Sequence, residues 1–304
     1  MKKKAAAKAV KKSAGKTVSA AKPAGRAVER TITHSEKRPD KRSDRSSDRR
    51  SDKRADGRTA DKPRPVKIIR GVLKHAEGSA LIQVGGTQVL CAVTIEERIP
   101  PWMRASGQKG RGWITAEYGM LPRSVPERAQ RGRVSGRSFE IQRLIGRSLR
   151  AVVDLTALGE KLLTVDCDVL EADGGTRVAS VTGAWVALNE AIEKLMADGK
   201  LPRTPDPRRA RVAAVSVGLV DGVPLLDLCH GEDTRAQVDL NVIGSSDGRL
   251  VEIQGAAESE PFEEEEIPRM LKLARIGLQA MFKAQERALA SPPGGPGKSL
   301  VRGR

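Results

Sequence analysis

A strand, a pair of glycines and a long apolar helix follow one another over residues 161–198, and this succession constrains the fold most. β-Branched and apolar residues over 161–170 indicate a buried strand, and residues 176–198 are rich in Ala, Val and Leu at helical spacing. Gly174 and Gly175 supply the tight turn between them. A buried strand that leads directly into a helix predicts a domain of mixed α and β structure.

The flanking segments predict further hairpins and helices. Asp221-Gly222 and Asp247-Gly248 are strong hairpin turn signals. The predicted strands lie at 66–96 (with turns at 77–79 and 85–87), 211–220, 223–229, 237–243 and 249–254, and the predicted helices at 137–153 and 262–290. The order is β-hairpins, helix, strand, helix, β-hairpins, helix. We therefore predict an α/β (α+β two-layer) single domain in which a strands-plus-helices unit occurs twice.

Residues 99–135 are rich in Pro, Gly and Arg, show little periodicity, and are predicted to form a long loop. Trp102, Trp113 and Tyr118 alternate there with cations, an arrangement that suits single-stranded nucleic acid. The alternative is a solvated loop whose aromatic side chains pack on the core. The basic residues of this loop are Arg104, Lys109, Arg111, Arg123, Arg128, Arg131 and Arg133.

The charge of the chain is concentrated at its start. Of the net charge of +17 over 304 residues, residues 1–62 carry +13, from 21 Lys and Arg against 8 Asp and Glu, which leaves +4 for the rest. Few apolar residues accompany this charge, so we expect a disordered basic arm over 1–62, a folded domain over 63–290 and a disordered Pro/Gly-rich tail over 291–304. The arm could hold RNA through phosphate contacts, or it could be a solubilising extension without an essential role.

Several classes of protein lose support. No apolar run is long enough for a signal peptide or a membrane span, so we expect a cytoplasmic protein with no membrane partner. Cys91, Cys167 and Cys229 are too scattered for a disulfide framework or a zinc site. The glycine motifs of dinucleotide and P-loop nucleotide sites are missing from the sequence.

The turn from strand to helix is a candidate anion site. A helix N-terminus presents unpaired N–H groups, Gly175 lets an anion approach the backbone, and Thr176 and Arg177 add a hydroxyl and a guanidinium. The alternative is a tight turn capped by Thr176, with Arg177 in solvent. Arg137 stands at the start of another predicted helix, where the dipole disfavours a cation unless an anion is bound. This conflict favours a phosphate role for Arg137.

A second candidate site lies over residues 227–239. Asp227, Glu232, Asp233 and Asp239 fall within this segment, and carboxylates with room for water suit Mg²⁺. Asp233 and Asp239 could share one ion if the chain bends between them, whereas acids in a loop are often merely solvated. His230 is better explained as structural. An anion site, an acid pair and a basic loop together indicate chemistry on a phosphodiester, with water or phosphate as the nucleophile.

Long stretches of the chain resemble ribonuclease PH, a family of bacterial phosphorolytic enzymes that trim tRNA. The resemblance rests on RPVKIIRGVLKHAEGSALIQVGGTQVLC (64–91), GWITAEYGMLPRS (112–124), GRSFEIQRLIGRSLRAVVDL (136–155), DCDVLEADGGTRVASVTGA (166–184), VAAVSVG (212–218), and VDLNVI with GRLVEIQGAAESEPF (within 238–262). It implies a fold of duplicated βαβα-type units shared with polynucleotide phosphorylase and exosome ring subunits. It also implies a hexameric ring, a trimer of dimers.

The same resemblance implies a reaction and the residues that perform it. The family removes nucleotides from the 3′ end of precursor tRNA with inorganic phosphate and Mg²⁺, releases nucleoside diphosphates, and can run in reverse. Two departures are the Cys229-His230 pair and the long arm. Two alternatives are a non-catalytic RNA-binding ring subunit and a hydrolytic, magnesium-dependent exoribonuclease. The implied phosphate ligands are Arg137, Gly175, Thr176 and Arg177, and the implied catalytic, metal-associated residues are Asp233 and Asp239. The tRNA-contacting loop of the family resembles the segment with Arg123, Arg128, Arg131 and Arg133, and we assign Arg143, on the next predicted helix, to RNA binding as well.

Overall fold

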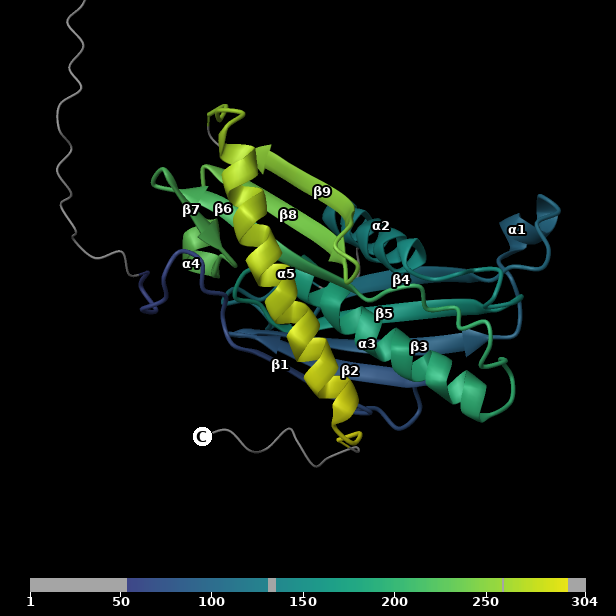
Figure 1. The fold of residues 1–304 in the computed structure, drawn as a ribbon. Helices are drawn as coiled ribbons and strands as arrows, with labels where there is room; N and C mark the ends of the chain where they lie inside the picture. Colours follow the sequence, from purple (N-terminus) through teal and green to yellow (C-terminus); the bar gives the residue numbers. More distant parts are fainter. Residues whose placement is uncertain (1–53, 131–134, 259, 295–304) are drawn as a thin grey trace, which may run out of the picture. The chain divides into compact units, whose positions relative to one another are not determined.

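The computed structural model describes residues 54–130, 135–258 and 260–294 (Figure 1). A first sheet of five strands has the order β1-β2-β3-β5-β4. The β2–β3 hairpin turns at the predicted Gly85-Gly86 pair. The strands are β1 (Val66–Arg70), β2 (Gly78–Val84), β3 (Thr87–Glu96), β4 (Trp113–Met120) and β5 (Leu162–Glu171).

A second sheet of four antiparallel strands has the order β7-β6-β8-β9. Asp221 and Gly222 connect β6 to β7 with φ values of 51° and 76°, the left-handed conformation that a two-residue hairpin requires. The strands are β6 (Val212–Val220), β7 (Val223–Leu226), β8 (Val238–Ser245) and β9 (Leu250–Ala257). The two hairpins that the turn signals predicted in this half of the chain are thus confirmed.

Part of the predicted loop over 99–135 is a strand, so the prediction is wrong there. β4 pairs in parallel with β5, and α2 (Gly136–Ala151) connects them; a short helix, α1 (Pro101–Ala105), precedes β4. Ile114, Ala116 and Tyr118 alternate inward along β4 and are buried. Proline and glycine on both sides obscured this alternation, and β4 lies at the edge of the sheet, where only one neighbour constrains its sequence.

Helix α3 (Thr176–Ala197) is buried over most of its length. It packs on β2 and β3 of the first sheet and also on β6 of the second. α5 (Glu266–Ala290) covers β6 and β7 and reaches β1, so it ties the two sheets together (Figure 1). Within α5 the buried Gln285 donates hydrogen bonds to the carbonyls of Thr182 and Val212, 3.1 and 2.8 Å away.

The domain starts earlier than the sequence predicted. Residues 54–62, assigned to the arm, pack on the second half of the domain, because the buried carboxylates of Asp227 and Glu232 pair with arginines of this segment. At the other end, Gly294 donates a hydrogen bond to the Arg70 carbonyl. The expectations for residues 1–53 and 295–304 lie outside the described residues. Within the part that is described, no helix is both long and apolar enough to cross a bilayer.

Candidate active site

A cavity of about 390 Å³ opens between the start of α3 and the second sheet. It brings the predicted anion site and the predicted acid pair together. Its polar lining comes from α2, from the turn before α3, from β6 and β8, and from the short helix α4 (His230–Asp233). The residues concerned are Arg137, Gly174, Gly175, Thr176, Arg177, Ser216, His230, Asp233, Asp239 and Asn241.

The turn between β5 and α3, residues 173–175, is held in a conformation that needs glycine. Gly174 and Gly175 have φ values of 76° and 68°, and Gly175 is the N-cap of α3. The Thr87 hydroxyl donates to the Gly174 carbonyl at 2.6 Å and accepts from the Asp173 N–H at 2.9 Å. Among the described residues no side chain accepts a hydrogen bond from the N-terminus of α3. The first N–H groups of the helix are therefore available to an anion in the cavity. We call residues 173–177 the anion loop.

Thr176 is anchored from the first sheet. It is buried, and its hydroxyl lies 2.9 Å from the phenolic hydroxyl of Tyr118 on β4. Burial raises the pKa of Tyr118, so the phenol stays neutral at physiological pH. The Arg177 guanidinium is held loosely by two acceptors, with Gln254 Oε1 at 3.4 Å and Glu140 Oε1 at 3.5 Å. Such long contacts leave the guanidinium free to engage a stronger acceptor in the cavity.

The four acids of the 227–239 segment divide into two pairs with different partners. Asp227 and Glu232 point away from the cavity, and their side chains are buried against Arg64 and Arg54. Asp233 and Asp239 line the cavity instead. The first pair is therefore structural, and only the second is available for a ligand.

Asp239 is a largely buried carboxylate that lines the cavity together with Asp233. Burial raises the pKa of its carboxyl, the nearby Asp233 carboxylate raises it further, and Arg177 opposes both. The Asn241 amide donates to its Oδ2 at 3.1 Å. A divalent cation between the two aspartates would relieve this repulsion. Among the described residues there is no cluster of three or more His, Cys, Asp or Glu side chains suited to a metal, and the candidate donor set is this pair of carboxylates. That donor set fits Mg²⁺, which usually takes one or two carboxylates and completes its shell with water and substrate oxygens.

Other residues of the cavity had no signal in the sequence. Ser216 on β6 lies opposite Asn241 on β8, and its hydroxyl is buried with no hydrogen-bond partner among the described residues. The hydroxyl can therefore offer a hydrogen bond to a polar ligand in the cavity. Only the pairing of β6 with β8 brings Ser216 to the site, so spacing along the chain could not identify it.

The basic and aromatic residues of 99–135 fall into two groups. Trp113 stacks edge-on with Trp102 at 5.1 Å and lies under the Arg150 guanidinium at 4.4 Å, and Tyr118 is buried. Trp113 and Tyr118 therefore pack within the fold, as the alternative interpretation held, whereas Trp102 is exposed. The predicted RNA ligands Arg128 and Arg143 are exposed, Arg123 contacts the Pro126 carbonyl at 2.9 Å, and Arg131 and Arg133 lie outside the described residues.

The fold and cavity define a two-sheet domain with an anion loop and an acid pair in one cavity, and two family models match the chain. The family described as "3′ exoribonuclease family, domain 1" matches residues 62–192, and "3′ exoribonuclease family, domain 2" matches residues 210–277. The chain belongs to this 3′ exoribonuclease family, within the ribonuclease PH-like superfamily. The two matches place a boundary between the two halves of what the sequence predicted to be a single domain.

Two solved exosome structures and one structure of rice Rrp46 are similar to this chain. An Archaeoglobus fulgidus exosome with RNA bound to the active site is 26% identical with a TM-score of 0.64, covering 77% of this chain and 92% of that chain. An archaeal exosome core is 25% identical with a TM-score of 0.60, covering 78% and 92%. Rice Rrp46, at 20% identity, a TM-score of 0.61 and coverage of 78% and 99%, shows the shared fold alone.

Proposed function

We propose that the protein is a phosphate-dependent 3′-to-5′ exoribonuclease that trims precursor tRNA and other structured RNA and releases nucleoside diphosphates. One observation carries this proposal: the anion loop and the acid pair line the same cavity. A phosphodiester bound to a metal at the acid pair leaves the anion loop for a second, separate anion. Phosphorolysis requires such a second anion site, and hydrolysis does not.

In the proposed reaction the chain orients inorganic phosphate for in-line attack. The phosphate oxygens accept hydrogen bonds from the backbone N–H groups at the start of α3, beginning with Gly175. They also bind the Thr176 hydroxyl and the guanidinium groups of Arg137 and Arg177. A phosphate oxygen bonds to the phosphorus of the terminal phosphodiester, and the bond from that phosphorus to the 3′-oxygen of the preceding nucleotide breaks. Positioning of this kind can lower the barrier by several kcal/mol, roughly 7–11 at most.

The acid pair acts on the leaving side. Asp233 and Asp239 would hold Mg²⁺, which supplies charge stabilisation to the scissile phosphate and the leaving oxygen. The attacking hydrogen phosphate loses its proton, and one of the two carboxylates relays a proton to the 3′-oxygen, which leaves as a hydroxyl. An excess of nucleoside diphosphate drives the same steps in reverse and extends the 3′ end of the RNA.

The RNA reaches the cavity along basic side chains. We assign Arg123, Arg128 and Arg143 to the RNA path on the exposed side of the site, and extend this assignment to Arg131 and Arg133 from the sequence. We further propose a cytoplasmic homohexamer, a trimer of dimers. The exposed apolar side chains of Phe139, Leu250 and Ile253 support contacts between copies.

The proposal is tested by incubating a 3′-extended tRNA with the purified protein and Mg²⁺, with and without inorganic phosphate. We expect shortening only with phosphate, with nucleoside diphosphates as products. Equal shortening without phosphate, with monophosphates released, would establish the hydrolytic alternative. Binding of the tRNA without shortening under either condition would establish the RNA-binding subunit.

A further inference from the structure

Residues 54–64 lie against the proposed active site although their composition resembles the charged arm before them. We call this segment the strap. The side chains of Arg54, Arg58 and Arg64 are only 4%, 7% and 4% exposed. The Ala60 carbonyl accepts a hydrogen bond from the Leu226 N–H at 2.8 Å, and Ala60 packs beside the apolar cluster of Val220, Leu225, Leu228 and Ala236. Buried arginines of this kind need specific partners.

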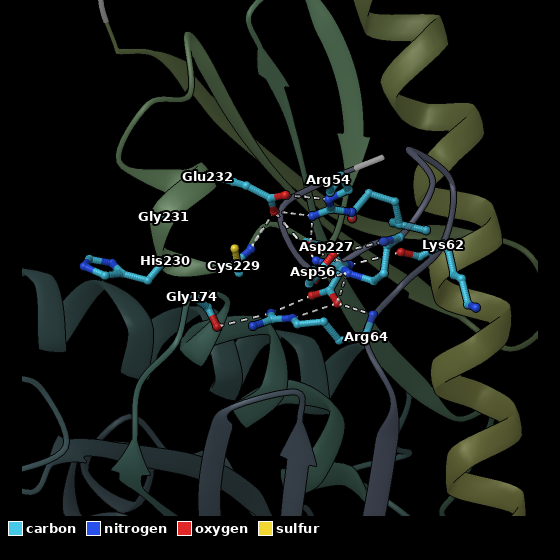
Figure 2. A network of polar contacts seen from close by, with 12 residues as sticks. Arg54, Asp56, Lys62, Arg64, Gly174, Asp227, Cys229, His230, Gly231 and Glu232 are labelled. Atoms are coloured by element: carbon cyan, nitrogen blue, oxygen red, sulfur yellow. Dashed lines mark hydrogen bonds and ion pairs between the residues drawn. The ribbon is translucent and has the colours of Figure 1, made fainter. Parts of the chain in front are cut away.

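Arg64 joins the two chemical segments of the site through one planar group. Its Nε and Nη2 atoms donate to the Asp227 carboxylate at 2.9 and 2.7 Å. On the other side its guanidinium donates to the Asp173 carbonyl and, at 3.4 Å, to the Gly174 carbonyl. Figure 2 shows Arg64 between Gly174 and Asp227. Because a guanidinium is rigid, this contact fixes the separation of the anion loop from residues 226–233, which we call the acid loop.

Arg54 holds the acid loop along its length. Its Nη1 and Nη2 atoms donate to the carbonyls of Leu226 and Asp227 at 2.6 and 2.8 Å, and its Nε donates to Glu232 Oε1 at 2.5 Å (Figure 2). Glu232 in turn accepts the Cys229 N–H at 3.0 Å and closes the first turn of α4. Burial acts to raise the pKa of Glu232, but the hydrogen bonds from Arg54 and Cys229 outweigh it, so the pKa is lowered and Glu232 stays charged.

Asp233 is the next residue after this clamp. Its N–H donates to the Cys229 carbonyl at 2.9 Å, so the direction of its side chain depends on the turn that Arg54 and Glu232 close. The neighbouring loop is fitted just as tightly: a Cβ at Gly174 would lie 2.6 Å from the Leu228 carbonyl. The His230 N–H also donates to Asp173 Oδ1 at 3.2 Å. The two loops are therefore in direct contact as well as joined through Arg64.

We propose that Arg54 and Arg64 are positioning residues of the active site: Arg64 sets the anion loop against the acid loop, and Arg54 with Glu232 sets the direction of Asp233. The roles of the two loops rest on the proposed function, whereas the contacts that join them do not. The strap is then part of the catalytic unit. Its two arginines should affect different ligands, phosphate for Arg64 and the metal for Arg54.

Full-length variants test this assignment. Arg64→Lys keeps the charge beside Asp227 and loses the reach to the Asp173 and Gly174 carbonyls; Arg54→Ala removes the clamp, and Arg54→Lys restores part of it. Arg209→Ala is the matched control, since Arg209 is an exposed arginine paired with Asp154. Two readouts are independent of RNA: binding of Mn²⁺ followed by electron paramagnetic resonance, and amide hydrogen exchange of peptides covering 171–178 and 226–234.

We expect Arg54→Ala to weaken Mn²⁺ binding by about tenfold, the lower end for loss of a group that orients a metal ligand. Exchange in 226–234 should rise, and Arg54→Lys should recover part of both. Arg64→Lys should raise exchange in 171–178 and increase the phosphate concentration for half-maximal trimming, with a smaller effect on Mn²⁺. Arg209→Ala should match the wild type throughout.

One combination of results would overturn the proposal. Lowered thermal stability in both strap variants, with wild-type Mn²⁺ binding, phosphate dependence and loop exchange, would reduce the strap to a structural contact and overturn the proposal. Failure of the proposed function would look different, because the wild-type protein itself would then shorten RNA without phosphate or not at all, while the exchange readout would still report on the strap.

Discussion

The phenolic hydroxyl of Tyr118, on an edge strand, lies 2.9 Å from the hydroxyl of Thr176 at the start of α3. This buried contact connects the first sheet to the anion loop and orients a side chain proposed to bind phosphate. β4 thus supports the site from the side opposite to the acid pair. A substitution that removes only the phenolic oxygen can test this hydrogen bond.

Tyr118→Phe removes the phenolic oxygen and leaves the ring in place. A net hydrogen bond is worth about 0.5–1.5 kcal/mol, so we expect the half-saturating phosphate concentration to rise by about two- to tenfold. The maximal rate of trimming should change less, because the acid pair is untouched. Steady-state kinetics at varied phosphate concentration checks this. An unchanged dependence on phosphate would show that the Tyr118 hydroxyl does not orient Thr176 for phosphate binding.

Asp239→Asn should lose activity and gain stability. The carboxyl is buried and lies near Asp233, and both raise its pKa in the folded protein. Such a group binds protons more readily folded than unfolded, so the wild type loses stability as the pH rises from the ordinary aspartate pKa of about 3.9 through the raised value. Without Mg²⁺, the variant should therefore melt at a higher temperature than the wild type at pH 7, with the difference vanishing in acid.

The turnover of the same variant should fall by about two decades or more, as is typical when an electrostatic catalytic group is removed. Single-turnover trimming of a 3′-extended tRNA measures this. Near-normal trimming would remove Asp239 from the proposed chemistry, whatever its effect on the melting temperature.

Gly174→Ala tests how tightly the two loops fit. Gly174 has a φ of 76°, and a Cβ there would lie 2.6 Å from the Leu228 carbonyl. Gly222, in the β6–β7 turn, has the same φ of 76° and open space around it. Both alanine variants carry the strain of a left-handed conformation, about 1–3 kcal/mol, but only Gly174→Ala adds a backbone clash. Urea unfolding should show the larger loss for Gly174→Ala, and equal losses would contradict the close fit.

The arginines of α2 should separate into RNA ligands and structural residues. Arg143→Ala removes an exposed cation and should weaken RNA binding, with the salt slope reduced by about 1. Arg150 lies 4.4 Å from the centre of the Trp113 ring and donates to the Ile114 carbonyl at 2.7 Å. Arg150→Ala should therefore lower stability and leave RNA affinity unchanged. RNA titrations at several salt concentrations distinguish the two outcomes.

Local patterns in the sequence predicted most of the fold. The Asp221-Gly222 turn and the Gly174-Gly175 turn are confirmed because each depends on residues adjacent in the chain. β4 was missed because an edge strand between Pro- and Gly-rich segments shows only a short alternation. The start of the domain was misplaced because Arg54 and Arg58 resemble solvated charges until their buried partners are known.

The candidate site was predictable only where its residues are close in sequence. The anion loop follows directly from one strand–turn–helix succession. The sequence did not predict that Asp227 and Glu232 are structural while Asp233 and Asp239 line the cavity. This division depends on arginines more than 160 positions away in the chain. Ser216 and Asn241 reach the cavity through the pairing of β6 with β8. Long-range pairing, which a linear pattern does not record, decides these cases.

The central claim is that inorganic phosphate is the nucleophile, and the fate of its phosphorus tests this most directly. Trimming of a 3′-extended tRNA by the full-length protein with Mg²⁺ and ³²P-labelled phosphate should place the label in the β-position of the released nucleoside diphosphates. Arg177→Ala should greatly reduce that transfer. Unlabelled nucleoside monophosphates from the wild-type protein would contradict the account.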